Sequence, residues 1–150
     1  MRRGFSVFAF SLLAITAVAC SSDSNPVAPT NPGGSNGVTT LRITDTRVGT
    51  GTEAVNGRTL TVHYTGWLYD QNAAGNKGTQ FETSIGRAPY SFTLGARQVI
   101  AGWDQGLVGM RVGGLRNLVI PASMAYGSQG SGQIPPNSAI VFDVELQSVQ

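Results

Sequence analysis

The feature that most constrains this chain is a two-residue alternation in two segments, residues 59–68 and 140–147. In the first segment Leu60, Val62 and Tyr64 share one face, while threonines and a histidine occupy the other. In the second, the apolar residues at even positions alternate with Val141, Asp143, Glu145 and Gln147. Successive side chains of a strand point to opposite faces of a sheet, so this period predicts two β-strands that each cover a core.

Shorter strands are predicted in three further places: residues 41–44, 90–94 and 115–120. Two polar or glycine-rich stretches are predicted to be surface loops, residues 70–79 and 127–136.

One segment has a different period. Val99, Trp103, Leu107 and Met110 are spaced by four, four and three residues, which predicts one apolar stripe of a short helix. Glycines within this segment weaken its intrinsic helix propensity, so tertiary packing must hold it. Several strands with one short helix, and no regular alternation of strands and helices, predict an α+β domain with an antiparallel sheet.

The N-terminus has the pattern of a secretory signal. Arg2 and Arg3 precede an apolar stretch at residues 5–18, which is too short for a comfortable transmembrane helix. Small residues then lead to Cys20, the only cysteine of the chain. The sequence AVAC at 17–20 resembles a bacterial lipobox, in which the cysteine is lipidated. The alternative is ordinary secretion after cleavage near Ala19, with an incidental free thiol.

These patterns divide the chain into three parts. Residues 1–19 are predicted to be a signal peptide, and residues 20–37 a lipidated Cys20 followed by a disordered tether. The tether is rich in Pro, Gly and small polar residues and has almost nothing to bury, so it cannot offset the entropy of ordering. Residues 38–150 are predicted to form the single globular domain. We expect a protein of the bacterial cell envelope, lipid-anchored at a periplasmic or outer-membrane face; secretion is the alternative.

Charge and composition exclude several classes of function. The formal net charge is +2, and without Arg2 and Arg3 eight basic residues face eight acidic ones, so no nucleic-acid partner is predicted. The predicted domain contains a single His, and the only Cys of the chain lies outside it. These residues provide neither a catalytic Cys/His pair nor a metal site. His63 is predicted to be a structural or surface residue. There is no phosphate-binding GxxxxGK[ST] loop, so hydrolase and kinase chemistry are poor candidates.

Six short motifs follow one another along the globular part. They are VHYTG at 62–66, FETS at 81–84, VIAGW at 99–103, AYG at 125–127, IPP at 134–136 and VFDVEL at 141–146. In this order they resemble the VHYTG, FDSS, VIxGW, AYG, IPP and VFDVEL signatures of the FKBP-type peptidyl-prolyl cis–trans isomerases. The similarity extends from about residue 39 to 149, essentially the whole predicted domain.

The resemblance implies a fold and a site. The fold is a twisted, mostly antiparallel sheet that wraps around one short α-helix, with an apolar prolyl-binding pocket between them. Carried over by motif, Trp103 forms the floor of this pocket, and the Ile100 backbone N–H binds a substrate carbonyl. The residues assigned to catalysis are Tyr64, Phe81, Glu82, Trp103, Tyr126 and Phe142, and those assigned to substrate binding are Arg87, Tyr90, Val99, Ile100 and Ile134.

The implied reaction agrees with the scarcity of catalytic groups. Rotation about an X–Pro peptide bond has a barrier of roughly 18–20 kcal/mol because resonance holds the amide planar. The planar form is charge-separated, and a dry aromatic pocket disfavours it relative to the twisted transition state. Neither a nucleophile nor a cofactor is required. The expected partners are proline-containing polypeptides and, by family resemblance, macrolide inhibitors; we expect a monomer.

Some residues depart from the family pattern. Glu82 stands where Asp is usual, and the extra methylene can shift this carboxylate by over an ångström, which would reduce activity. Gln98 stands where Glu is common. Arg87 is assigned as the partner of the acidic group, although residues 85–89 are one residue shorter than is usual. The main prediction is an isomerase that assists the folding of extracytoplasmic proteins; the alternative, favoured by Glu82, is a weakly active or non-catalytic prolyl-binding chaperone module.

Overall fold

The computed structural model describes residues 37–150. The predicted signal peptide, Cys20 and the predicted tether as far as residue 36 lie outside the described residues. None of the helices in the described part is long and apolar enough to span a membrane.

A twisted antiparallel sheet dominates the described residues. The sheet has the strand order β1-β5-β6-β2-β3, and β4 also pairs with β2. Its strands are β1 (Arg42–Arg47), β2 (Thr59–Tyr69), β3 (Lys77–Thr83), β4 (Tyr90–Thr93), β5 (Leu115–Ile120) and β6 (Ile140–Val149). Every pairing is antiparallel. The two segments with the clearest alternation, β2 and β6, pair with each other at the centre of the sheet.

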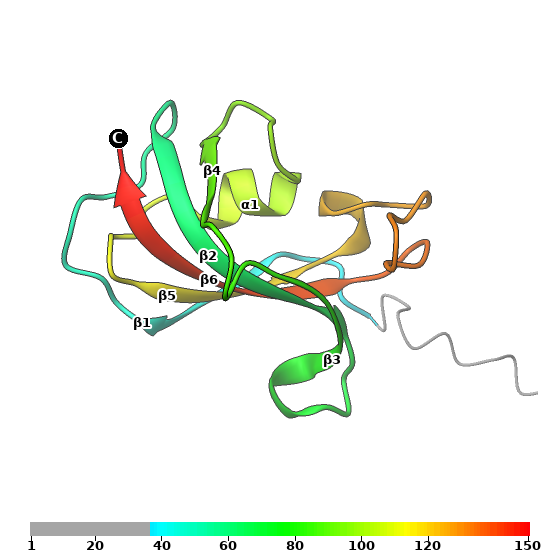
Figure 1. The fold of residues 1–150 in the computed structure, drawn as a ribbon. Helices are drawn as coiled ribbons and strands as arrows, with labels where there is room; N and C mark the ends of the chain where they lie inside the picture. The colour runs from blue at the N-terminus through cyan, green and yellow to red at the C-terminus, as the bar shows by residue number, and fades with distance from the viewer. Residues whose placement is uncertain (1–36) are drawn as a thin grey trace, which may run out of the picture.

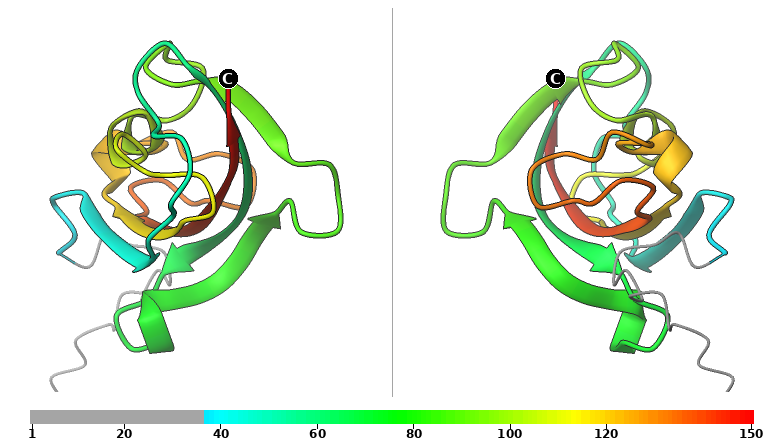
Figure 2. Two further views of the ribbon diagram at one scale, coloured as in Figure 1. Left: turned by 90° about the vertical axis from the view of Figure 1, so that its left-hand side faces the viewer. Right: turned by 90° about the vertical axis from the view of Figure 1, so that its right-hand side faces the viewer.

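The sheet curves around one short helix, α1 (Ala101–Gly106) (Figures 1 and 2). Two 3-10 turns, η1 (Ala74–Asn76) and η2 (Ala122–Met124), complete the elements of the described residues. This architecture confirms the predicted α+β fold with a sheet wrapped around a helix.

The main core lies between the concave face of the sheet and α1. The even-numbered residues of β2 and β6 point into it, as the alternation predicts. Its fully buried side chains include Leu60, Val62, Leu118, Ile120, Ile140, Val144 and Leu146. A smaller cluster covers the opposite face of the sheet and consists of Val38, Tyr69, Val119, Ala139 and Val141. The buried Val38 packs the beginning of the described chain against that face.

Two sequence predictions were wrong at their boundaries. Residues 77–79, predicted as loop, belong to β3, a strand that the sequence pattern does not predict. Lys77 pairs with Tyr69 of β2, which the polar composition of this stretch does not reveal. The helix is shorter than the apolar stripe from Val99 to Met110, since Val99 precedes it and Met110 follows a turn at Gly109, whose φ is +76°. Both side chains still pack on the core, so the stripe continues beyond the helix.

A glycine allows α1 to lie close to the sheet. A Cβ atom built on Gly102 would lie 2.4 Å from Cγ2 of Ile120 in β5, a distance that no side chain tolerates without a shift. The glycine that lowers the helix propensity of this segment therefore sets the distance between helix and sheet.

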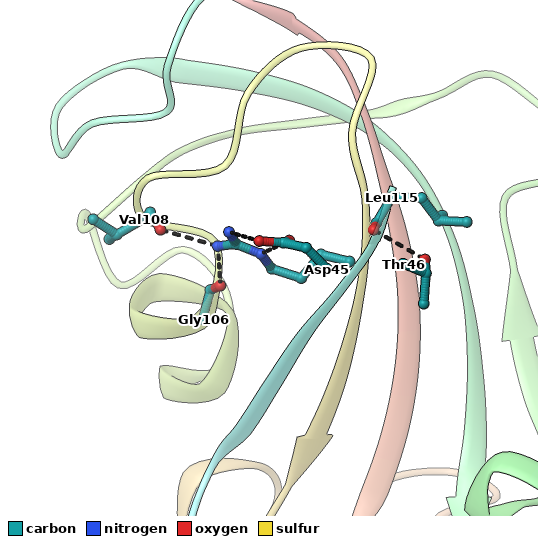
Figure 3. Close-up of polar contacts among 6 residues, drawn as sticks. Asp45, Thr46, Gly106, Val108 and Leu115 are labelled. Atoms are coloured by element: carbon teal, nitrogen blue, oxygen red, sulfur yellow. Dashed lines mark hydrogen bonds and ion pairs between the residues drawn. The ribbon is translucent and has the colours of Figure 1, made fainter. Parts of the chain in front are cut away.

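The buried side chain of Arg116 joins β1, β5 and the end of α1 (Figure 3). Its Nε and Nη2 donate to the two carboxylate oxygens of Asp45 on β1, at 2.6 and 3.0 Å. Its Nη1 donates to the carbonyls of Gly106 and Val108 at 2.9 and 3.0 Å. The hydrogen bond from Arg116 lowers the pKa of Asp45 below its ordinary value. Arg116 thus satisfies carbonyls that the helix end leaves without intrahelical partners.

Candidate active site

A cavity of about 470 Å³ opens between α1 and the sheet. This volume is typical of small-molecule and peptide side-chain sites. The residues that line it come from β2, β3, β4, α1, β6 and two loops: Tyr64, Glu82, Tyr90, Gln98, Val99, Ile100, Trp103, Tyr126 and Phe142. Five elements and two loops therefore meet at one site.

The bottom of the cavity is a cluster of aromatic rings in edge-to-face contact. The Trp103 ring lies 5.1 Å from that of Tyr64 and 5.2 Å from that of Phe142, each at 81° between planes. Tyr90 contacts Trp103 in the same way at 6.4 Å. Such contacts are the favoured geometry of aromatic pairs, and they hold each ring in a single orientation. Trp103 and Phe142 are only 4% and 3% exposed, so the floor is closed to bulk water from behind.

The loop that precedes α1 is braced by side-chain hydrogen bonds. The Asp104 carboxylate accepts from the backbone N–H groups of Gly95 and Arg97 at 2.9 and 3.0 Å. The Gln98 side-chain oxygen accepts from the Thr93 N–H at 2.9 Å. Among the described residues, the N–H of Ile100 forms no hydrogen bond to an acceptor, while its carbonyl accepts from the first turn of α1. A backbone donor is therefore held at the wall of the cavity without an internal partner.

Glu82 dominates the electrostatics of the cavity. Among the described residues that line the cavity, it alone has a charged side chain, and it is exposed. Burial raises the pKa of Tyr64 to about 12, and the neighbouring Glu82 carboxylate adds to this shift. Burial also raises the pKa of Tyr126, again with a contribution from the charge of Glu82. Both phenols therefore keep their protons at neutral pH and can donate hydrogen bonds.

The chemistry available in the cavity is non-covalent. Its lining, as formed by residues 37–150, contains no Ser, Cys, His or Lys that could act as an activated nucleophile. Residues 37–150 contain no cluster of three His, Cys, Asp or Glu that could hold a metal ion. His63 lies on the opposite face of β2 from Tyr64, where its Nδ1 is 3.0 Å from the Ser84 hydroxyl. An apolar aromatic floor with a few polar donors suits binding and distortion of a substrate rather than bond cleavage.

Comparison with known proteins identifies the family. Residues 50–147 match the family model described as FKBP-type peptidyl-prolyl cis-trans isomerase. This chain belongs to the FKBP family. Its activity is peptidyl-prolyl cis–trans isomerisation, which confirms the family and the reaction predicted from the six motifs.

Relatives of the FKBP domain are found in bacteria and eukaryotes. The chain is 49% identical over 111 residues to an FK506-binding protein of Neisseria meningitidis, covering 73% of this chain and 95% of that protein. Among solved structures, FkpA from Escherichia coli is similar at 40% identity and a TM-score of 0.64, over 75% of this chain and 49% of that one. AtFKBP13 is similar at 37% identity and a TM-score of 0.63, over 73% and 93%.

Eight of the eleven predicted pocket residues of the FKBP domain line the cavity. They are Tyr64, Glu82, Tyr90, Val99, Ile100, Trp103, Tyr126 and Phe142. Phe81 and Ile134 instead lie behind the lining. The Phe81 ring packs perpendicular to that of Phe142 with centroids 5.6 Å apart, and Ile134 is buried in the main core.

A second glycine makes the support by Phe81 possible. A Cβ atom on Gly66 of β2 would lie 2.6 Å from ring atoms of both Phe81 and Phe142. Any other residue there would separate the two rings and disturb the floor of the FKBP cavity.

Arg87 and Gln98 are two further positions where the site differs from the predicted list. Arg87 is exposed on the loop between β3 and β4 and does not line the cavity. Gln98 was not assigned to the site but lines it, held there by its bond to Thr93. Its position immediately before the VIAGW motif of the FKBP domain is the signal that would have found it.

Proposed function

We propose that the aromatic cavity encloses the prolyl ring of a polypeptide and accelerates rotation about the X–Pro bond. Trp103, Tyr64 and Phe142 form the floor on which the ring packs, while Val99 lies at the wall. Phe81 and Ile134 support this lining from behind. The observation that carries the proposal is that one cavity combines a dry aromatic floor with the backbone N–H of Ile100, which has no hydrogen-bond partner among the described residues.

The apolar floor and the hydrogen-bond donors of the cavity have different roles in the reaction. The planar form is charge-separated, so transfer from water to an apolar site costs it more than it costs the twisted form. The Ile100 N–H holds a neighbouring substrate carbonyl and so fixes the orientation of the chain. The hydroxyl groups of Tyr126 and Tyr64 supply further hydrogen-bond donors in the cavity. Catalysis then arises from selective binding of the twisted state, without covalent chemistry.

The test of these roles is the rate of cis-to-trans conversion of a short X–Pro peptide with the purified chain. We expect acceleration in proportion to protein concentration, and a loss of at least tenfold in kcat/KM for Trp103→Ala. Normal acceleration by a folded Trp103→Ala protein would refute the assignment of the floor. If the folded wild-type protein binds such a peptide without accelerating its conversion, the chaperone alternative is favoured instead. The longer side chain of Glu82 is the feature that favours this alternative.

The setting of this activity is a separate proposal. The lipobox-like AVAC sequence at residues 17–20 and the Pro- and Gly-rich segment after it support an isomerase anchored by lipidated Cys20 to the cell envelope. There it would assist the folding of extracytoplasmic proteins. Cys20→Ser expressed in a bacterium should move the protein from the membrane to the soluble fraction. Membrane retention of this variant would count against lipid anchoring, whereas a soluble wild-type protein would favour secretion.

Inhibition by macrolides is proposed for the same cavity. The Neisseria meningitidis relative is named an FK506-binding protein, and the cavity has the volume and the aromatic lining that a drug-sized apolar ligand needs. FK506 should therefore inhibit peptide isomerisation competitively. Binding that leaves the rate unchanged would place the macrolide outside this site.

A further inference from the structure

The cavity carries a negative charge that no described basic side chain neutralises. Among residues 37–150, the carboxylates in ion pairs belong to Asp45, Glu53, Asp143 and Glu145. Glu82 is absent from these pairs, and Arg87, its expected partner, is exposed and away from the lining. The neighbours of Glu82 in the cavity are the neutral phenols of Tyr64 and Tyr126. The charge of Glu82 is therefore directed at whatever enters the site.

Glu82 lies at the mouth of the cavity rather than at its floor. Its side chain is exposed, whereas Trp103 beneath the cavity is almost fully buried. A prolyl ring seated on Trp103 therefore leaves the residues on either side of proline to face the mouth. The side chains of these flanking residues are the parts of a substrate that meet the Glu82 carboxylate.

The same cavity also offers an exposed aromatic surface. Tyr90 lines the same cavity and is 42% exposed. Lys and Arg have aliphatic stems that cover apolar surface while their charged heads reach a polar group, and a cation over a tyrosine face is attracted by the ring. A carboxylate that shares a cavity with an exposed tyrosine ring thus matches a basic side chain and repels an acidic one.

We infer that this isomerase prefers prolines flanked directly by Lys or Arg, and that Glu82 is the residue that sets this preference. The inference rests on the proposed binding of the prolyl ring in this cavity. It concerns the choice among substrates and is independent of how fast the best substrate is converted.

Two matched series of peptides test the preference. Ala-X-Pro-Phe and Ala-Leu-Pro-X peptides with X as Lys, norleucine or Glu vary the charge with little change in the aliphatic stem. At low salt we expect kcat/KM for Lys to exceed that for norleucine by about two- to fivefold in at least one series, with Glu lowest. The ratio should fall towards one at high salt, because the site is open to solvent. Equal values for Lys and norleucine in both series at low salt would overturn the inference.

A pair of variants locates the origin of the preference. Glu82→Gln should bring the Lys-to-norleucine ratio to about one, whatever its effect on the absolute rate. Glu53→Gln removes an exposed carboxylate outside the cavity and should leave the ratio as in the wild type. A preference that survives Glu82→Gln would overturn the role of Glu82.

A binding measurement separates this inference from the proposed function. Titration of the same peptides, followed by tryptophan fluorescence, reports their affinities without turnover. If no peptide is isomerised but the Lys peptide still binds tightest and loses this advantage in Glu82→Gln, the catalytic role fails and the preference stands. If all peptides are isomerised and bound equally, the preference fails and the catalytic role stands.

Discussion

The floor and the mouth of the cavity are built in different ways. The floor consists of Trp103, Phe142 and Tyr64, which come from α1 and the two central strands and pack ring against ring. The mouth consists of exposed residues from an edge strand and a loop, with Glu82 and Gln98 among them. Floor residues hold the fold and shape the site together, so their substitution should change stability and activity. Mouth residues make few core contacts, so their substitution should change activity alone.

The strongest test of this contrast is Trp103→Ala. Loss of a buried aromatic side chain should lower the free energy of unfolding by about 3–5 kcal/mol, and the floor should cease to hold the prolyl ring. Urea unfolding and the peptide assay measure the two effects. The matched control is Trp67→Ala, because Trp67 lies on the face of β2 that points away from the cavity and contacts Lys77. We expect the kcat/KM of this variant to stay within about twofold of the wild type. A Trp103→Ala protein as stable as the wild type but inactive would show that this floor residue does not contribute to the stability of the fold.

Arg116→Met tests whether a residue that stabilises α1 from outside the cavity affects stability but not activity. The substitution leaves Asp45 and two carbonyls without their donor, and we expect a loss of about 2–3 kcal/mol. The value lies below that of a fully buried pair because the Asp45 side chain is 36% exposed. Activity of the folded protein should stay within about threefold of the wild type. The exposed Arg111, paired with Glu53, provides the control, and Arg111→Met should cost less than about 1 kcal/mol.

The pH dependence of stability tests the contribution of the ion pair between Asp45 and Arg116. The pKa of Asp45 is lower in the folded protein than its ordinary value of 3.8. Its contribution is therefore complete above pH 3.8 and is lost as the pH falls through the folded pKa. The stability difference between the wild type and Asp45→Asn should accordingly narrow between pH 5 and pH 2.5. Chemical unfolding at several pH values measures this, and a constant difference would mean that the ionised form of Asp45 contributes nothing.

Glu82→Asp is expected to have the smallest effect on stability and a clear effect on rate. An exposed side chain at the mouth should change the free energy of unfolding by no more than about 0.5 kcal/mol. Aspartate restores the residue usual in the family motif, and we expect kcat/KM to rise by about threefold or more because the carboxylate returns to its usual position. Glu53→Asp, outside the cavity, should leave the rate unchanged. An unchanged or lower rate in Glu82→Asp would show that the longer side chain is well placed.

The same contrast explains which parts of the fold could be predicted. β2 and β6 were readable because their alternation reflects burial on one face. β3 was not predicted at all, because an edge strand is defined by its backbone pairing, and Lys77, Gly78 and Thr79 show no apolar pattern. The helix was predicted too long because Val99 and Met110 pack on the same core without being helical. A period of burial therefore predicts which side chains face the core better than it predicts where an element ends.

By itself, the sequence determined the sheet faces, the aromatic floor and the family, because alternation and short motifs record local burial and backbone geometry. Only the tertiary structure decided which residues reach the cavity. Phe81 was set behind the floor by its contact with Phe142, and Gln98 was brought to the wall by a hydrogen bond to the end of β4. Arg87 is exposed on the loop between β3 and β4, outside the lining. The physical reason is that loop and edge residues take their positions from long-range pairing, which no local pattern encodes.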